Sequence, residues 1–126
     1  MSKRVYGIDL GTTYSCIAYA DEYGKPVVVP NSENQTTTPS VVYFDTPTNV
    51  VVGLNAKENA AVHSELVVSS IKRSMGDPFY EREIHGRGYK PEEISSYIIR
   101  RLVEDAAKAN ITGDMIEDVV ITCPAY

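Results

Sequence analysis

The last third of the chain carries the pattern that most restricts its fold, a long amphipathic helix followed by a short apolar strand. Pro91 suits the first position of a helix, and apolar residues recur every four positions from Ile94 to Ala106, with charged residues on the opposite face. Residues 119–121, Val-Val-Ile, then form a continuous apolar run typical of a buried parallel strand. Because a helix leading into a parallel strand covers a sheet, the sequence predicts an α/β fold.

The first half of the chain is expected to form β-strands joined by tight turns. The pattern predicts strands at residues 5–10, 14–20 and 26–29, paired as an antiparallel meander, and a hairpin from residues 40–44 and 50–52. Two helical pieces are expected next, at residues 55–65 and 66–75, the second ending at Gly76. Residues 77–89 show no clear period, with a turn near Gly86 and Gly88, and the long helix is expected to end at residues 112–114.

Composition excludes several classes of protein. The chain has 126 residues, 43% hydrophobic and 23% charged, which suits one globular domain and not a disordered tail. Two cysteines are too few for a disulfide scaffold. The net charge is −5 and no basic run exceeds a pair, so no nucleic-acid partner is expected. Since no apolar run suits a membrane span or a signal peptide, no membrane partner is expected and we predict a cytoplasmic location.

Residues 7–16, Gly-Ile-Asp-Leu-Gly-Thr-Thr-Tyr-Ser-Cys, carry the strongest chemical signal in the sequence. Asp9 lies near the end of a predicted strand, and Gly11, Thr12 and Thr13 form the turn that follows. Without a side chain, Gly11 would let phosphate oxygens approach backbone amides, and the two threonine hydroxyls add donors. Asp9 would hold Mg²⁺ through ordered water, because this ion gives up its hydration shell reluctantly. The alternative is a plain β-turn; a Walker loop is excluded because a strand, not a helix, follows.

This segment resembles the first phosphate loop of the actin-like ATPases, and most closely that of the DnaK-type seventy-kilodalton heat-shock chaperones. Further segments match that family in the same order along the chain, at residues 37–40, 52–57, 70–76, 91–95 and 120–126. The resemblance covers essentially the whole chain. It implies an α/β fold of the ribonuclease-H-like, actin-like ATPase class. Residues 1–39 and 91–126 would form an incomplete first lobe, with residues 40–90 as a small inserted α+β subdomain.

The resemblance also implies roles for residues of the phosphate turn. Gly11, Thr12, Thr13 and Tyr14 match positions that line the β- and γ-phosphates of ATP or ADP. Asp9 matches the acid that organises Mg²⁺ and its water shell. The cofactors expected from the resemblance are therefore ATP or ADP and Mg²⁺.

Three later residues match functional positions of the same family. Lys72 matches the lysine that reaches the γ-phosphate and the attacking water; alternatively, it complements a helix C-terminal dipole. Pro124 resembles a proline that relays nucleotide state to the substrate-binding domain, and Arg73 is either part of that relay, through interdomain salt bridges, or a solvated charge. The chain departs from the family at Thr36, where arginine is usual, so the contacts of that guanidinium are lost or replaced.

The implied function is ATP hydrolysis coupled to binding and release of unfolded polypeptides. A J-domain cochaperone and a nucleotide exchange factor are the implied partners of the full-length protein. A parallel strand normally feeds a crossover helix, so we expect this chain to be the front part of a longer protein that alone binds nucleotide weakly and self-associates. The alternatives are a sugar-kinase-like or cytoskeletal relative, or a noncatalytic fragment that only engages partner proteins.

Overall fold

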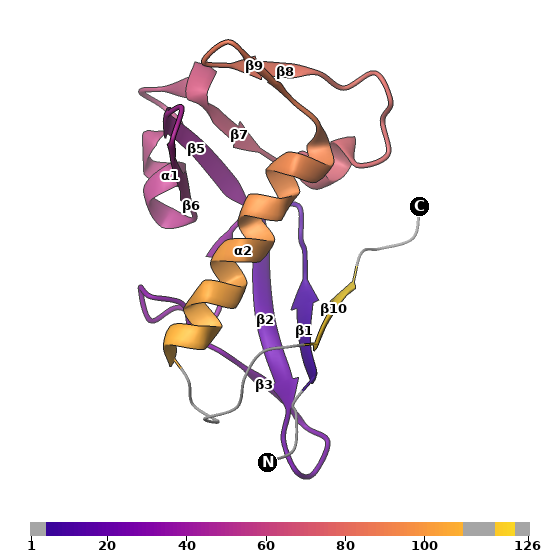
Figure 1. Ribbon diagram of the computed structural model, residues 1–126. Helices are drawn as coiled ribbons and strands as arrows, with labels where there is room; N and C mark the ends of the chain where they lie inside the picture. Colours follow the sequence, from indigo (N-terminus) through magenta and orange to yellow (C-terminus); the bar gives the residue numbers. More distant parts are fainter. Residues whose placement is uncertain (1–4, 110–117, 123–126) are drawn as a thin grey trace.

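The main sheet has five strands, four of them in the order β10-β1-β2-β3 and the fifth, β4, paired with β2 (Figure 1). The computed structural model describes residues 5–109 and 118–122. Strands β1 (Val5–Asp9), β2 (Tyr14–Ala20) and β3 (Pro26–Val28) form an antiparallel meander, and β10 (Asp118–Thr122) pairs with β1 in parallel. The predicted meander and the parallel direction of the last strand are therefore confirmed. A two-residue strand, β4 (Thr38–Pro39), pairs with the start of β2.

The long helix α2 (Pro91–Ala109) packs on one face of this sheet, as the apolar period predicted. Alternate residues of β1 and β2 point toward it, and together they form the core with one stripe of the helix: Tyr6, Ile8, Ile17, Tyr19, Ile94, Ile98, Leu102 and Ala106. All of these side chains are buried. Burial of this apolar stripe holds α2 against the sheet, while the other face of the helix is mostly polar.

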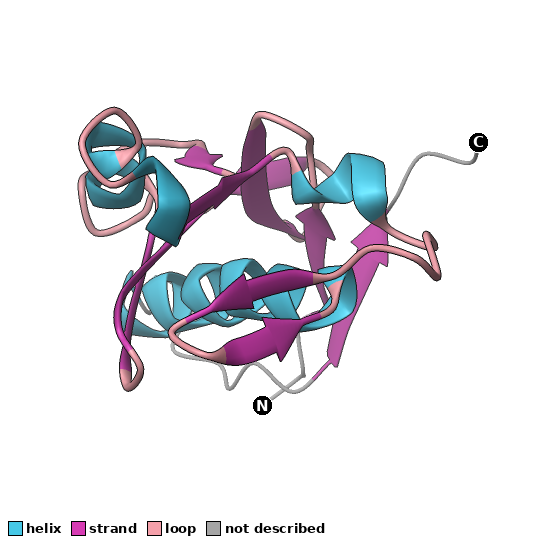
Figure 2. Ribbon diagram, turned by 90° about the horizontal axis from the view of Figure 1, so that it is seen from above, coloured by secondary structure: helices cyan, strands magenta, loops and turns pink. Residues whose placement is uncertain are grey.

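A second, three-stranded sheet lies beside the first, in the order β6-β5-β7. Its strands are β5 (Val41–Thr46), β6 (Asn49–Val52) and β7 (Val67–Ser69), and the first two form the predicted hairpin. The short helix α1 (Leu54–Asn59) packs on β5 and β6, whereas the 3₁₀ turn η2 (Ile71–Ser74) packs against α2 (Figure 2). One core cluster includes residues of both sheets, among them Ile8 and Phe44. The division of the chain at residues 39/40 and 90/91 stays a prediction.

The two helical pieces predicted between residues 55 and 75 are largely wrong. The first helix ends at Asn59, and a 3₁₀ turn, η1 (Ser64–Leu66), follows after a gap. The second piece is a strand followed by η2, because Val67 and Val68 pair with β5. Helix propensity is a weak preference, and pairing of β-branched residues on an existing strand overrides it.

Residues 77–89, which showed no period, contain a hairpin that the sequence did not reveal. Strands β8 (Arg82–Ile84) and β9 (Arg87–Tyr89) pair around His85 and Gly86, whose φ angles are 52° and 77°. Two successive residues in the left-handed region are the geometry of a type I′ turn. Gly88, predicted as part of the turn, lies within β9.

The last strand is not buried on both faces. Val120 is 55% exposed and Ile121 is 44% exposed, because β10 is the edge of the sheet in the part of the chain that the structure describes. The predicted end of the long helix, at residues 112–114, lies outside the described residues.

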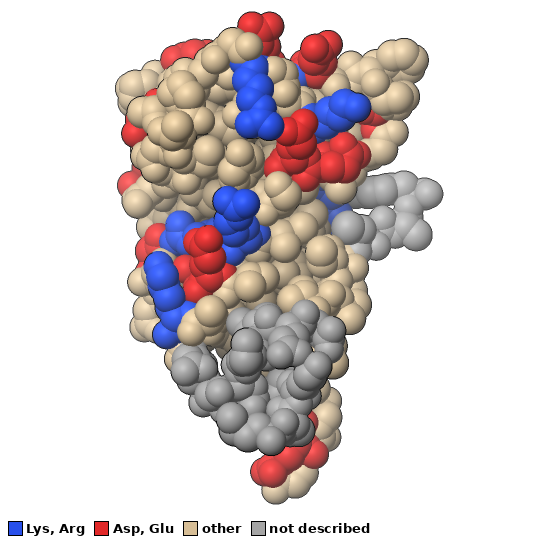
Figure 3. Space-filling view, in the orientation of Figure 1, with Lys and Arg blue, Asp and Glu red and all other residues tan. Residues whose placement is uncertain are grey.

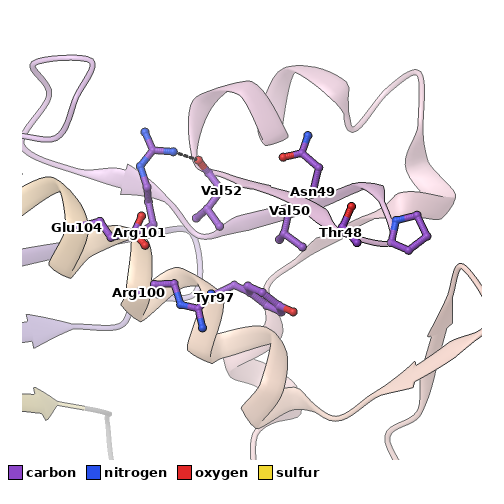
Figure 4. Close-up of a pocket in the computed structure, with 9 residues that line it drawn as sticks. Thr48, Asn49, Val50, Val52, Tyr97, Arg100, Arg101 and Glu104 are labelled. Carbon is purple, nitrogen blue, oxygen red and sulfur yellow. Dashed lines mark hydrogen bonds between the residues drawn. The ribbon is translucent and has the colours of Figure 1, made fainter.

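Arg101 fastens α2 to two other elements. Its guanidinium donates to the carboxylate of Asp105 at 2.9 Å, to the carbonyl of Val52 at 2.8 Å and to the hydroxyl of Ser32 at 2.7 Å, and it pairs with Glu33 at 3.2 Å. Figure 4 shows the bond to Val52 at the wall of a 380 Å³ pocket between α2 and the β5–β6 hairpin. Burial alone would lower the pKa of Arg101, but the charges and hydrogen bonds of Asp105 and Glu33 outweigh it and raise that pKa.

The visible charges are mixed in sign. On the face drawn in Figure 3, Lys and Arg side chains lie among Asp and Glu side chains instead of forming one continuous basic surface. Within the described ranges, no helix has both the length and the apolar character needed to cross a bilayer.

Candidate phosphate-binding turn

The turn between β1 and β2 is held by two buried serines. The amide of Gly11 donates to the hydroxyl oxygen of Ser15 at 3.2 Å, and the Ser15 and Ser40 hydroxyls lie 2.8 Å apart. The amide of Ser40 donates to the carbonyl of Thr13 at 2.9 Å. Since both serines are buried, these bonds fix the turn against the segment that contains β4.

Gly11 has a structural role inside the turn, and its predicted role at the phosphate stays a prediction. A Cβ atom at this position would overlap the backbone carbonyl oxygen of Tyr14, inside the same turn. Glycine is therefore required for closing the turn, before any ligand is considered. The amide of Gly11 is already bonded to Ser15, so the predicted approach of phosphate to the backbone would use other amides of the turn.

Thr12 and Thr13 keep their donors available. Among the described residues, neither their amides nor their hydroxyls have a hydrogen-bond acceptor. Both residues border a cavity of about 250 Å³, which Ser69 and Ser70 also line. Backbone amides and hydroxyls that face open space in a fixed turn suit phosphate oxygens.

Asp9 is exposed at the end of β1, where its neighbours across the sheet are Cys16 on β2 and Thr122 on β10. Burial, followed by the nearby Asp9 carboxylate, raises the pKa of the Cys16 thiol, and a hydrogen bond from the Asp9 backbone opposes this shift in part. Cys16 is half-buried, not a full core residue. The raised pKa makes its thiolate, the reactive form, less abundant.

Lys72 lies in η2 and is only 5% exposed. It does not border the cavity, but Ser69 and Ser70, which lead into η2, do. Ser70 has a φ of 57°, an uncommon value for a residue other than glycine, and this sharp bend sends the chain from β7 into η2. The structure thus brings the turn and the segment before Lys72 together, and Lys72 itself follows in η2. Arg73 is exposed, and Pro124 lies outside the described residues.

One residue at this site was not singled out from the sequence. Lys57 of α1 donates from its ammonium to the hydroxyl of Tyr14 at 3.1 Å, and its ammonium lies 5.3 Å from the centre of the Tyr14 ring. Tyr14 is 45% exposed. Its side chain contacts Lys57 of α1, while its backbone begins β2 directly after the turn. No short motif joins positions 14 and 57; the packing of α1 on β5 and on β4, which pairs with β2 at Tyr14, brings them into contact.

Comparison with known families identifies the family of the chain. The family model described as Hsp70 protein matches two segments, residues 5–85 and 78–126. The chain belongs to the Hsp70 family. This family has the actin-like ATPase fold, and the mixed α/β structure is consistent with it. The match favours a chaperone over a sugar-kinase-like or cytoskeletal relative.

Hsp70 proteins bind ATP or ADP with Mg²⁺, and the residues of this turn fit those ligands. Mg²⁺ in nucleotide sites takes one or two carboxylates, with phosphates and water as its other ligands. A single exposed Asp9 suits that mode, whereas no group of three or more metal-binding side chains occurs among the described residues. The free donors of Thr12 and Thr13 suit the phosphates.

Proposed function

We propose that this chain is the part of a DnaK-type Hsp70 chaperone that carries the first phosphate turn of its ATPase. The full-length protein would couple ATP hydrolysis to binding and release of unfolded polypeptides in the cytoplasm. A J-domain cochaperone and a nucleotide exchange factor would be its regulatory partners. Pro124 and Arg73 would take part in passing the nucleotide state to the peptide-binding domain.

The observation that carries the proposal is the fixed turn with unused donors. The Ser15–Ser40 pair holds its backbone, while Thr12 and Thr13 have no acceptor within the described part of the chain. Thr12 is half-buried and Thr13 is exposed, so donors that now face solvent are open to a ligand while the backbone of the turn stays fixed. Prearranged donors are also what stabilises charge in phosphoryl transfer, since they need no reorganisation.

Each residue has a separate part in this mechanism. Thr12 and Thr13 would bind phosphate oxygens, and Asp9 would hold the water shell of Mg²⁺, which when bound neutralises phosphate charge. Lys72 would stabilise the charge that develops on the transferred phosphoryl group. Lys72 follows Ser69 and Ser70, which line the same cavity as Thr12 and Thr13, so its segment of the chain lies close to the turn.

A calorimetric titration with ADP and Mg²⁺ tests the turn directly. The 126-residue chain is expected to bind weakly and the full-length protein tightly. Replacing Thr13 by alanine should weaken binding about tenfold in both, the loss expected for a charge-assisted hydrogen bond. Thr48→Ala, on the exposed β5–β6 turn, removes the same group elsewhere and should leave binding unchanged. Equal affinity of Thr13→Ala, Thr12→Ala and the unchanged protein would contradict the proposal.

A further inference from the structure

One hydrogen bond between η2 and α2 is made to a methionine sulfur. The hydroxyl of Ser95, near the start of α2, donates to the Sδ atom of Met75, which directly follows η2, at 3.2 Å. Ser95 is only 2% exposed, and this sulfur is the only partner of its hydroxyl among the described residues. A thioether is a weak acceptor, so a buried hydroxyl depends here on a bond that chemistry at the sulfur easily changes.

Met75 lies between this buried contact and the solvent. The residue is 37% exposed, so part of its side chain meets water although Ser95 does not. Its amide donates to the carbonyl of Lys72 at 3.2 Å, which ties Met75 to the last turn of η2. A change at the sulfur therefore acts both on α2, through Ser95, and on the segment that carries Lys72. The other two methionines, Met1 and Met115, lie outside the described residues.

A thioether sulfur that is exposed to solvent reacts with hydroperoxides. A sulfur lone pair attacks one peroxide oxygen, an S–O bond forms while the O–O bond breaks, and the released hydroxide takes the proton of the transferred oxygen to become water. The sulfur loses two electrons and the peroxide gains them. The product, methionine sulfoxide, is polar, and methionine sulfoxide reductases return it to the thioether. Because the proton of Ser95 draws electron density from the sulfur, the hydrogen bond slows this attack.

We propose that Met75 is a reversible oxidation site whose co-substrate is a hydroperoxide, and that Ser95 is the residue through which oxidation loosens η2 from α2. A sulfoxide carries an oxygen on the sulfur and favours contact with water, so it leaves the buried side of the contact. The Ser95 hydroxyl then stays buried without an acceptor, which costs stability. Only the consequence for Lys72 rests on the proposed function, since the oxidation and the loss of the Ser95 bond involve no nucleotide.

Peroxide treatment of the 126-residue chain, followed by mass spectrometry of the peptide that contains Met75, measures the modification. Urea denaturation before and after treatment measures its effect. Oxidation should lower the folding equilibrium constant about tenfold, as for one buried hydroxyl left unpaired, and a methionine sulfoxide reductase should reverse the loss. Met75→Leu keeps an apolar side chain of similar volume without an oxidisable sulfur, so its stability should not respond to peroxide.

Ser95→Ala separates the hydrogen bond from oxidation in general. This variant should oxidise at Met75 faster than the unchanged chain, because the sulfur has lost its donor. It should also lose less stability on oxidation, because no buried hydroxyl is left behind. Ser96→Ala is the matched control, since Ser96 is the next residue of α2, is exposed and bonds to the carbonyl of Glu93 instead. Its oxidation rate and its loss of stability should equal those of the unchanged chain.

The outcomes that overturn this proposal differ from those that overturn the proposed function. Absence of sulfoxide at Met75, under peroxide that oxidises free methionine, would overturn the oxidation site. An equal loss of stability in the unchanged chain and in either Met75→Leu or Ser95→Ala would do the same. If Met75 oxidises with the expected loss while Thr13→Ala leaves ADP binding unchanged, the oxidation site stands and the phosphate turn does not. The reverse pair of results leaves the phosphate turn standing alone.

Discussion

Lys72 combines a buried side-chain stem with a charge, so truncation to alanine would change two things at once. Lys72 is 5% exposed in η2, which packs against α2, so Lys72→Ala would leave a void as well as remove a charge. Methionine keeps most of the stem and removes only the ammonium. In the full-length protein, we expect Lys72→Met to slow ATP hydrolysis about a hundredfold with little change in nucleotide affinity, because its charge matters most in the transition state.

Single-turnover kinetics with a separate binding titration distinguish these effects for Lys72. Arg73→Met is the matched control, since Arg73 is the adjacent cation but is exposed. It should leave the chemical step unchanged. Hydrolysis at a normal rate in Lys72→Met would contradict the catalytic role and favour the alternative, in which the charge of Lys72 complements the C-terminal dipole of a helical turn.

At the scale of elements, Arg101 is the strongest single connection between α2 and its neighbours. Removing its guanidinium leaves Asp105, only 4% exposed, without its partner and frees the carbonyl of Val52. Breaking a buried ion pair from one side is costly, because the remaining charge stays desolvated. We expect Arg101→Met to lower the free energy of unfolding by about 3 kcal/mol, measured by urea denaturation.

Arg100→Met provides the control for Arg101. Arg100 is next along the same helix, and its recorded contact is with the Tyr97 ring, 5.9 Å from the guanidinium. A surface contact of this kind contributes under about 1 kcal/mol. Similar losses for the two variants would show that helix propensity or net charge, and not the Arg101 network, sets the stability.

The β8–β9 hairpin allows a test of backbone conformation alone. A Cβ on Gly86 would meet no atom within 4 Å, yet its φ is 77°. Gly86→Ala should therefore destabilise the protein by about 1 kcal/mol through backbone strain without any clash. Gly88→Ala, two residues later with ordinary φ, should be neutral or slightly stabilising. The difference in urea midpoint between these two variants is the measurement, and equal midpoints would contradict the type I′ assignment.

How far the sequence predicts each element depends on whether its partners are local. The meander of β1 to β3 and helix α2 follow from short turns and from a period within one segment. The strand β7 was predicted as helix because Val67 and Val68 become a strand only through β5, more than twenty residues earlier. The same holds at the site: the turn was visible in residues 7–16, whereas its supports, Ser40 and Lys57, come from distant segments.

At the scale of the whole molecule, the main sheet has one face covered by α2 and one face left open by the described residues. Its face opposite α2 carries a row of small and apolar residues that crosses the strands β10, β1, β2 and β3: Val120, Gly7, Ala18 and Val28. Val120 and Val28 are exposed. No helix of the described part of the chain packs on this row. An apolar row next to the unpaired edge of β10 favours association.

We therefore predict that the 126-residue chain self-associates through the β10 side of the sheet. Light scattering across a concentration series should show a rising mean mass. Val120→Lys places a charge in the row and beside the edge, so it should shift the chain toward monomer, because a charge there must be desolvated when two copies meet. Val62→Lys is the control, since Val62 is more exposed, at 73%, but lies outside both sheets. A mass that stays monomeric at all concentrations, or an equal effect of Val62→Lys, would show that the open face remains in contact with water.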